Sequence, residues 1–470
     1  MQEIKKINLS LEWKYEKLGK LCSFDKEGVN PKEDIKYYHY SFPAFDNNKE
    51  PEVEVGKDIK SSKFLFNKGD ILFNKLNVKF KRVWDIDFDI DENSICSTEF
   101  IPIQAKNIDR NFLYYCLISP NFTNEMKYLS TGTSNSHQRI NPKDIKDYDL
   151  FLPTDEEIQK KIGYILKLLD KKISMNVKIN KNLEEQIETI YNSFFVYYDD
   201  FSKEELEECE IGLIPKDWKL MSLGEVTTKI KEKVGSDDYK VFSAVNTGNL
   251  ILSEEYFDKQ VYSKNIEKYI VVKQKEFAYN PARINIGSIG RNDFNYDGCV
   301  SPVYVAFKVE EGYENFMNMY IKSNRFNQWV VTLSSGSVRQ TLNYADFSII
   351  KIAYPPKDLV NKFNKVYDNY YEVINYNNSV ISNLENIRDT LLPKLMSGEI
   401  DVSKINCDLK IIIRKIYIKS SKLFLWRYLS ENKNYIKNTK SNETLLKSRT
   451  IYKINKFLAK FNARYRYYRQ

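Results

Sequence analysis

The chain repeats itself once, after about 200 residues, and this repeat severely restricts the folds open to it. Four landmarks recur in the same order along the sequence. They are Glu12-Trp13-Lys14 with Leu18-Gly19 and Asp217-Trp218-Lys219 with Leu223-Gly224 (offset 205), Ser130-Thr131-Gly132 and Ser334-Ser335-Gly336 (offset 204), Pro153 and Pro355 (offset 202), and Asn182-Leu183-Glu184 and Asn383-Leu384-Glu385 (offset 201). Such a period is too long for a solenoid, so the sequence predicts a duplicated unit of one domain and one helix.

Within each repeat, the residue composition and the hydrophobic period change once. Residues 13–153 and 218–355 contain short runs of Tyr, Phe, Val and Ile broken by Gly, Pro, Asn and Asp, which predicts a mixed α/β (α+β) fold with much strand. Residues 155–197 and 357–397 contain almost no breakers and have a period near 3.5, which predicts long helices. We therefore predict domains over 1–153 and 201–355, helices over 154–200 and 356–400, and a basic extension over 401–470.

The two predicted helices carry coiled-coil seams, with apolar residues at alternating steps of four and three. At 1.5 Å per residue, about 43 residues make a rod on the order of 60 Å long. Asn176 and Asn377 interrupt the seams six residues before each Asn-Leu-Glu, and we expect them to set the pairing register, unless they are solvated where the helices diverge. The seams are Ile162, Leu166, Leu169, Ile173, Asn176, Asn180, Leu183, Ile187, Ile190 and Phe194, and Leu359, Phe363, Val366, Tyr370, Val373, Asn377, Val380, Leu384, Ile387 and Leu391.

The net charge of +8 is concentrated at one end of the chain. Residues 401–470 hold 18 Lys and Arg against 4 Asp and Glu, which leaves residues 1–400 mildly acidic. Nucleic-acid binding by the main body would therefore depend on local basic loops. No apolar run approaches the ~18–20 residues that span a bilayer, and the N-terminus lacks an apolar signal core, so we expect a cytoplasmic protein with no membrane contact.

Motifs for catalysis or cofactor binding are missing from the sequence. The six cysteines form no CxxC pair, only two histidines occur, and no glycine-rich phosphate-binding motif is present. We therefore expect no catalytic residue, no metal site and no cofactor bound by this chain. A single-chain nuclease or methyltransferase would require such motifs.

Three polar segments are candidates for contacts with DNA, a long regular polymer on which two linked domains could recognise two marks. The first packs four cations among aromatic and amide side chains, and the other two form a matching loop in each repeat, rich in Ser, Gln and Arg. A solvated basic hairpin or an ordinary turn would have the same composition. The candidates are Asn74, Lys75, Asn77, Lys79, Lys81 and Arg82; Thr133, Ser134, Ser136, His137, Gln138 and Arg139; and Ser335, Ser337, Arg339 and Gln340.

Several longer segments carry a resemblance to a known family. Residues 280–290 with 300–304 are similar to the core of one class of target-recognition domain, and residues 41–46 with 69–76 are similar to another class. Residues 391–400, Leu-Leu-Pro-Lys-Leu-Met-Ser-Gly-Glu-Ile, are similar to the end of a second spacer helix. Over about residues 5–405 the chain resembles the specificity subunit of Type I restriction-modification systems.

The resemblance implies two target-recognition domains, each recognising half of a bipartite site in double-stranded DNA. It implies that two long antiparallel coiled-coil spacer helices form a pseudo-two-fold repeat, set the gap between the half-sites and dock two methylation subunits. Those partners would bind S-adenosylmethionine and methylate adenine at N6, while restriction subunits would use ATP and Mg; the chain itself would be non-catalytic. The two repeats diverge outside the landmarks, which predicts two different half-sites. The resemblance adds Asn280, Arg283, Asn285 and Ser288 to the candidate DNA contacts.

The C-terminal extension departs from the family pattern, because about sixty-five residues follow the point where members commonly stop. We expect either a basic helical DNA-contacting arm, a translated extension without a selected function, or a remnant of rearrangement between neighbouring specificity genes. For the whole chain, the alternative function is a protein-interaction scaffold with incidental DNA binding.

Overall fold

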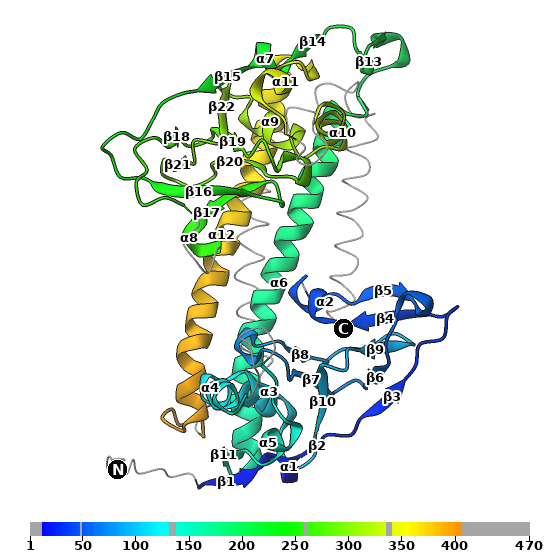
Figure 1. The fold of residues 1–470 in the computed structure, drawn as a ribbon, viewed down its shortest axis with the longest axis vertical. Helices are drawn as coiled ribbons and strands as arrows, with labels where there is room; N and C mark the ends of the chain where they lie inside the picture. The colour runs from blue at the N-terminus through cyan, green and yellow to red at the C-terminus, as the bar shows by residue number, and fades with distance from the viewer. Residues whose placement is uncertain are drawn as a thin grey trace, which may run out of the picture. The chain divides into compact units, whose positions relative to one another are not determined.

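The computed structural model describes residues 12–47, 49–130, 138–256, 262–334, 341–403 and 405, so the C-terminal extension lies almost wholly outside the described residues. The chain divides into unit 1, Met1–Lys178 with Asn377–Leu423, and unit 2, Ile179–Tyr376 with Phe424–Gln470. Each unit contains one domain of strands and short helices, together with half of each of two 40-residue helices, α6 (Glu156–Phe195) and α12 (Lys357–Met396) (Figure 1).

Unit 1 builds its domain from two sheets and a two-stranded ribbon. The sheets have the orders β2-β10-β7-β8 and β3-β6-β9-β4-β5, and β1 pairs antiparallel with β11, from Trp13 opposite Pro153 to Lys17 opposite Asp149. The elements are β1 (Trp13–Lys17), α1 (Leu18–Leu21), β2 (Cys22–Ser23), β3 (Glu27–Val29), β4 (Lys36–Tyr40), α2 (Phe42–Asp46), β5 (Glu52–Val55), η1 (Gly56–Asp58), β6 (Lys63–Leu65), β7 (Ile71–Asn74), η2 (Val78–Phe80), β8 (Val83–Asp85), β9 (Ser94–Cys96), β10 (Phe100–Ala105), α3 (Arg110–Ile118), α4 (Pro120–Leu129), α5 (Pro142–Lys146) and β11 (Asp149–Pro153).

Unit 2 repeats this plan. The sheet β15-β22-β19-β20 has the same order as β2-β10-β7-β8, the ribbon β14–β23 corresponds to β1–β11, and a second sheet has the order β17-β16-β21-β18. The elements are η3 (Lys203–Glu205), β12 (Leu206–Cys209), β13 (Gly212–Pro215), β14 (Lys219–Ser222), α7 (Leu223–Val226), β15 (Thr227–Ile230), β16 (Lys240–Val245), β17 (Asn249–Leu252), α8 (Ser253–Tyr256), β18 (Ile270–Val272), β19 (Phe277–Tyr279), η4 (Ile284–Ile286), β20 (Ile289–Arg291), β21 (Gly298–Val300), β22 (Val305–Val309), α9 (Glu314–Tyr320), α10 (Asn324–Leu333), α11 (Tyr344–Ser348) and β23 (Lys351–Tyr354).

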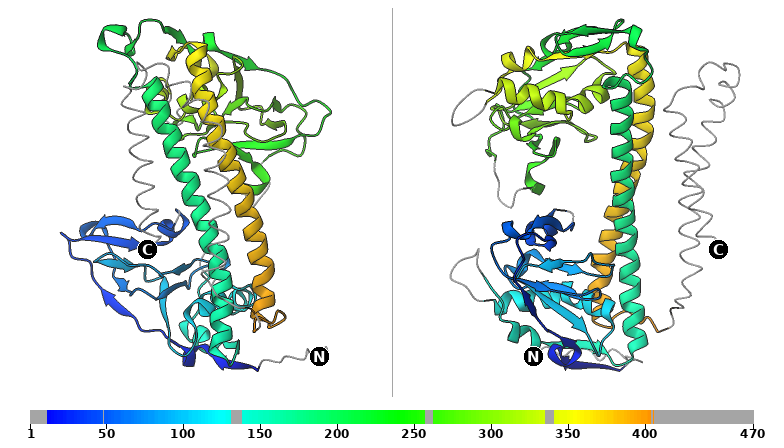
Figure 2. Two further views of the ribbon diagram at one scale, coloured as in Figure 1. Left: turned by 180° about the vertical axis from the view of Figure 1, so that it is seen from behind. Right: turned by 90° about the vertical axis from the view of Figure 1, so that its right-hand side faces the viewer.

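Within each unit the two long helices run antiparallel and share the core of the domain. In unit 1, where the two helical segments lie side by side in both views of Figure 2, Asp170 of α6 pairs with Arg388 of α12 at 2.9 Å. In unit 2, Tyr370 of α12 donates to the Gln186 side chain of α6 at 3.1 Å. The buried face of α6 contributes Ile162 to the first core. Each such apolar side chain contributes roughly 1.5–3 kcal/mol on burial, so the helices and domains stabilise one another.

Local chemistry sets the ends of the helices. The Asp155 carboxylate accepts a hydrogen bond from the Glu157 amide at 2.8 Å and so caps the start of α6. Beyond the end of α12, Gly398 has φ +74°, and a Cβ there would lie 2.9 Å from the Trp13 ring. The Leu-Pro-Lys-Leu segment supplies Leu392 and Leu395 to the core of unit 1, which gives this motif a packing role.

The mixed α/β fold with two long helices is confirmed, and most of both seams is buried or half-buried. Asn176 is 3% exposed and Asn377 9% exposed, so the alternative that they are solvated is wrong. Their role in register stays a prediction, as do the domain boundaries. Ile387 is 46% exposed, so the predicted seam is not buried at that position. Among the helices of the described ranges, none is long and apolar enough to cross a membrane.

Candidate DNA-binding loops

The first candidate loop leaves the sheet of unit 1 at the end of β7. Asn74 is 1% exposed, and its side-chain oxygen accepts a hydrogen bond from the Leu76 amide at 2.7 Å, which turns the chain. The turn η2 follows, with Val78 buried beneath it and Lys81 in the left-handed region at φ 43°. The Asn74 side chain therefore shapes the loop and is too buried to contact a base, contrary to our expectation.

A second candidate segment lies against this loop. The Asn77 amide donates to the Gln138 carbonyl at 2.8 Å, and the Ile140 amide donates to the Lys75 carbonyl at 2.9 Å. Arg139 pairs with Glu99 at 2.6 Å. The structure thus joins two segments that the sequence analysis treated separately. Thr133, Ser134, Ser136 and His137, in the same polar loop, lie outside the described residues.

Cations and an exposed ring share the tip of the first loop. The ammonium of Lys79 lies 4.8 Å from the centre of the Phe80 ring, and the Arg82 guanidinium lies 4.8 Å from the same ring. Arg82 also pairs with Asp46 through two hydrogen bonds of 2.8 and 2.6 Å. Lys79 and Lys81 are exposed, whereas Arg82 is held by the protein and stiffens the loop.

Further lysines surround the base of the loop, and the sequence analysis missed them. Loss of water contacts and the nearby charges of Lys75 and Lys146 lower the pKa of Lys26 from its ordinary value. Like charges held this close repel one another, and a phosphate group between them would relieve the repulsion. Lys26 and Lys146 lie far from residues 74–82 in the sequence, so no local pattern could have found them.

The loop of unit 2 follows the end of β19. The Asn280 side chain accepts from the Ala282 amide at 3.1 Å, and the turn η4 ends at Gly287, which has φ +85°. Arg283 and Asn285 are exposed at its surface. Ser288 is 3% exposed, and its carbonyl accepts from the Asn280 amide at 3.0 Å to close the loop. Ser288 is therefore too buried to contact DNA directly, contrary to our expectation.

The two loops have the same backbone design at an offset of 206. Asn74 corresponds to the Asn280 cap, and Val78 to Ile284, each buried beneath its turn. Lys81 corresponds to Gly287, each in the left-handed region. The signal available in the sequence was an aromatic residue followed by Asn at the end of an apolar run, in Phe73-Asn74 and Tyr279-Asn280.

The loop of unit 2 also joins the chain that follows its own polar segment. The Leu342 amide donates to the Pro281 carbonyl at 3.1 Å, which corresponds to the bond between Ile140 and Lys75 in unit 1. Ser335, Ser337, Arg339 and Gln340 lie outside the described residues. In each unit a capped turn is thus hydrogen-bonded to the chain that follows the polar segment, at Ile140 and Leu342, while the side chains at the two tips differ.

A polar junction ties the first loop's strand to the helices of unit 1. Asp85, at the end of β8, lies 2.6 Å from the Arg110 guanidinium of α3 and also contacts the Lys167 ammonium of α6. Lys167 pairs with Asp87 as well, at 3.1 Å. The junction is ionic and only partly exposed, so it fixes the domain against α6.

The corresponding junction of unit 2 uses different chemistry. Arg291, at the end of β20, donates to Asn315 of α9 at 2.7 Å and to the Tyr367 hydroxyl of α12 at 3.1 Å. Asn318 donates to the same hydroxyl at 3.0 Å. The partners of Arg291 on α9 and α12 are therefore neutral, and its ion pair, at 2.5 Å, is with Asp293, two residues further along its own chain segment.

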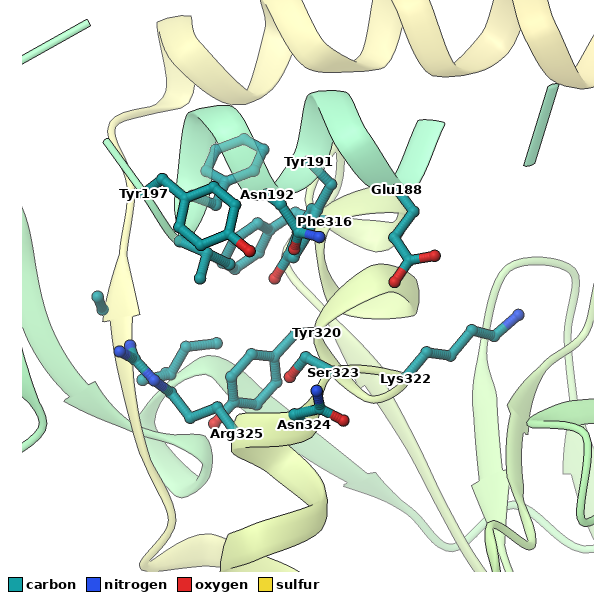
Figure 3. Close-up of a pocket in the computed structure, with 14 residues that line it drawn as sticks. Glu188, Tyr191, Asn192, Tyr197, Phe316, Tyr320, Lys322, Ser323, Asn324 and Arg325 are labelled. Atoms are coloured by element: carbon teal, nitrogen blue, oxygen red, sulfur yellow. The ribbon is translucent and has the colours of Figure 1, made fainter. Parts of the chain in front are cut away.

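A pocket of about 160 Å³ lies in unit 2 beside the end of α6 (Figure 3). Tyr191 and Asn192 of α6 line one wall, and Tyr320 and Arg325 lie across from them. The Tyr320 hydroxyl donates to the Lys351 carbonyl at 3.1 Å, so this polar group stabilises the domain. We assign no ligand to this pocket.

His39, Glu52 and Glu54 bring possible metal-ligating atoms within 4.8 Å of one another on β4 and β5. Glu54 contacts the Nδ1 atom of His39, and Ser41 donates to Glu52 at 2.8 Å, so the cluster is partly satisfied by the protein itself. No motif spacing in the sequence pointed to this group.

Comparison with known proteins gives a consistent family. Residues 10–185 match the family model described as the type I restriction modification DNA specificity domain. The chain is 23% identical to the type I restriction enzyme HindI specificity subunit of Haemophilus influenzae, over 75% of this chain and 92% of that protein. It is also 23% identical to the MjaIX specificity subunit of Methanocaldococcus jannaschii, over 64% of this chain and 72% of that protein.

A solved structure shares the fold. The crystal structure of a type I restriction-modification S subunit from M. genitalium superposes with a TM-score of 0.51 at 15% identity, and the match covers 83% of this chain and 98% of that one.

Proposed function

Because the chain belongs to the family of type I restriction-modification specificity subunits, we propose that each of its two domains recognises one half of a bipartite DNA site. The observation that carries this proposal is the pair of loops, which share one capped backbone at an offset of 206 and differ in their exposed side chains. A shared backbone presents side chains in the same way, and different side chains select different bases. We therefore expect the two half-sites to differ in base sequence.

The chemistry of the complex would come from partners. Two methylation subunits would dock on α6 and α12, bind S-adenosylmethionine and methylate adenines at N6, and restriction subunits would add ATP- and Mg-dependent cleavage. The chain itself would be non-catalytic and would hold no cofactor. The two relatives described above are both named as specificity subunits, which supports this division of labour.

The two domains should differ in how strongly salt weakens their binding. Among the residues that the structure describes, the first loop carries Lys75, Lys79 and Lys81 with Lys26 nearby, whereas the exposed tip of the second carries Arg283. Phosphate contacts release counterions, so each one lost makes the dependence of affinity on salt shallower. The first half-site would therefore supply most of the electrostatic attraction.

The proposal is tested by mapping N6-methyladenine across the host genome with and without this gene. We expect a methylated motif of two short, unlike half-sites with a constant gap, lost when the gene is deleted. An unchanged methylation map would contradict the proposal. Equal affinity of the purified complex for any duplex, at several salt concentrations, would favour the interaction scaffold.

A further inference from the structure

One apolar side chain projects from the same place in both loops. Phe80 ends η2 and Ile286 ends η4, at the offset of 206 that relates the two loops. Each is 49% exposed. A single exposed apolar residue is ordinary on a protein surface, but its recurrence at equivalent positions in two diverged domains is not explained by packing.

The neighbours of these side chains are hydrogen-bond donors. Lys79 flanks Phe80, and Arg283 and Asn285 flank Ile286, all exposed. The major-groove edge of an A·T pair offers acceptors at adenine N7 and thymine O4 beside the thymine 5-methyl group. An apolar side chain set among donors is complementary to that edge. The apolar side chain itself can form neither a hydrogen bond nor an ion pair with a phosphate.

The turns that carry these two side chains are also held in place. Asn74 and Asn280 fix the turns, and in unit 1 the Arg82 guanidinium lies against the Phe80 ring while pairing with Asp46. A rigid side chain loses little conformational freedom on binding. Phe80, supported by Arg82, is therefore preorganised for a base contact, and Ile286 projects from a turn of the same design.

We propose that Phe80 and Ile286 are specificity-determining residues, each packing against the 5-methyl group of a thymine in its own half-site. The inference rests on the proposed function. The adenine methylation proposed above places at least one A·T pair in each half-site, so each offers a thymine. The difference between a flat ring and a branched aliphatic chain then contributes to the difference between the half-sites.

The test uses the complex of the full chain with its methylation subunits and the bipartite motif found by methylation mapping. Each thymine of the motif is replaced singly by deoxyuridine, which removes the methyl group alone. We expect one position in each half-site where this weakens binding about fourfold, the effect of losing one buried methyl group. Phe80→Ala should abolish that difference in the first half-site and keep it in the second, and Ile286→Ala should do the reverse.

Lys79→Ala is the matched control. It should weaken binding to the thymine-containing and the deoxyuridine-containing DNA equally, so that the ratio of the two affinities is preserved. The preserved discrimination in the other half-site shows that each variant is folded. The inference would be overturned by a wild-type complex that is specific yet insensitive to every deoxyuridine, or by a Phe80→Ala variant that keeps the difference. The proposed function would survive either result. Insertion of the Phe80 ring between base pairs would be one cause of such a result. A wild-type complex without sequence preference would contradict the proposed function instead.

Discussion

Lys26 illustrates how charges within a protein prepare a contact with phosphate. Its ammonium group loses part of its contact with water and lies near Lys75 and Lys146, so protonation costs more than in water and its pKa is lowered. A DNA phosphate would compensate this cost and favour the protonated form. As the pH rises, the affinity for DNA should then fall, while the free energy of unfolding should increase.

We predict that affinity for the first half-site falls as pH rises toward the lowered pKa of Lys26, below the range where an ordinary lysine titrates. The free energy of unfolding contributed by Lys26 should instead increase with pH there, because the unfolded chain binds the proton more tightly. Binding titrations and urea unfolding at several pH values, compared with Lys26→Gln, measure both effects. The variant should also flatten the salt dependence by about one unit. Identical pH profiles for variant and wild type would refute the assignment.

Single residues were the hardest to assign from sequence. That the segments around Asn74 and Asn280 contact DNA stays a prediction, but Asn74 is buried as a cap, and Ser288 is buried as well. Polar residues serve both as turn caps and as base contacts, and only burial separates the two roles. The pairing of Arg82 with Asp46 joins residues far apart in the sequence, so it could not be predicted.

At the scale of elements, the junctions between domain and helix show one geometry built with two chemistries. Asp85 contacts Arg110 and Lys167 in unit 1, while Arg291 contacts Asn315 and Tyr367 in unit 2. Arg291 is buried and forms its ion pair with Asp293, so its contacts with α9 and α12 are hydrogen bonds to neutral side chains. Salt screens partly exposed ion pairs between domain and helix more than such buried hydrogen bonds. The attachment of the first domain to its helix should therefore be the more sensitive to salt.

We predict that Asp85→Asn loosens the junction of unit 1 by roughly 1–3 kcal/mol, because two partly buried cations lose their shared counter-charge. Hydrogen–deuterium exchange of the full chain should become faster in α3 and the first half of α6, and high salt should act on the wild type in the same direction. Exchange in α9 should not change. The matched variant Tyr367→Phe should affect α9 and leave α3 unchanged. Equal changes in both units would argue against separate junctions.

The helices and strands with the strongest local sequence pattern were the ones that could be predicted. The helices α6 and α12 have sustained 3.5-residue periods, and their presence is confirmed. The strands are mostly two to six residues long, and their order in each sheet depends on distant partners that no local period specifies. The matching of the two loops was missed because their only shared residue type is the capping Asn.

For the whole molecule, the division of the helices between units is the central feature. The first half of α6 and the second half of α12 belong to unit 1, and the remaining halves belong to unit 2. Each domain is therefore attached to both helices through its own core, by residues such as Ile162 and Leu392 in unit 1 and Ile187 and Phe363 in unit 2. A change in helix length acts on the attachment of both domains together.

Removing one heptad from each helix, residues 176–182 and 377–383, therefore tests whether the helices set the gap between half-sites. Two turns in each helix correspond to about 10 Å, or roughly three base pairs of duplex, while the apolar seam continues across the deletion. We predict that both half-sites stay the same and that the gap shortens by about three base pairs, measured by methylation mapping of cells carrying the shortened gene. A deletion in α6 alone should abolish methylation, because the seams then lose their alignment. An unaltered gap in the double deletion would show that the helices do not set the distance.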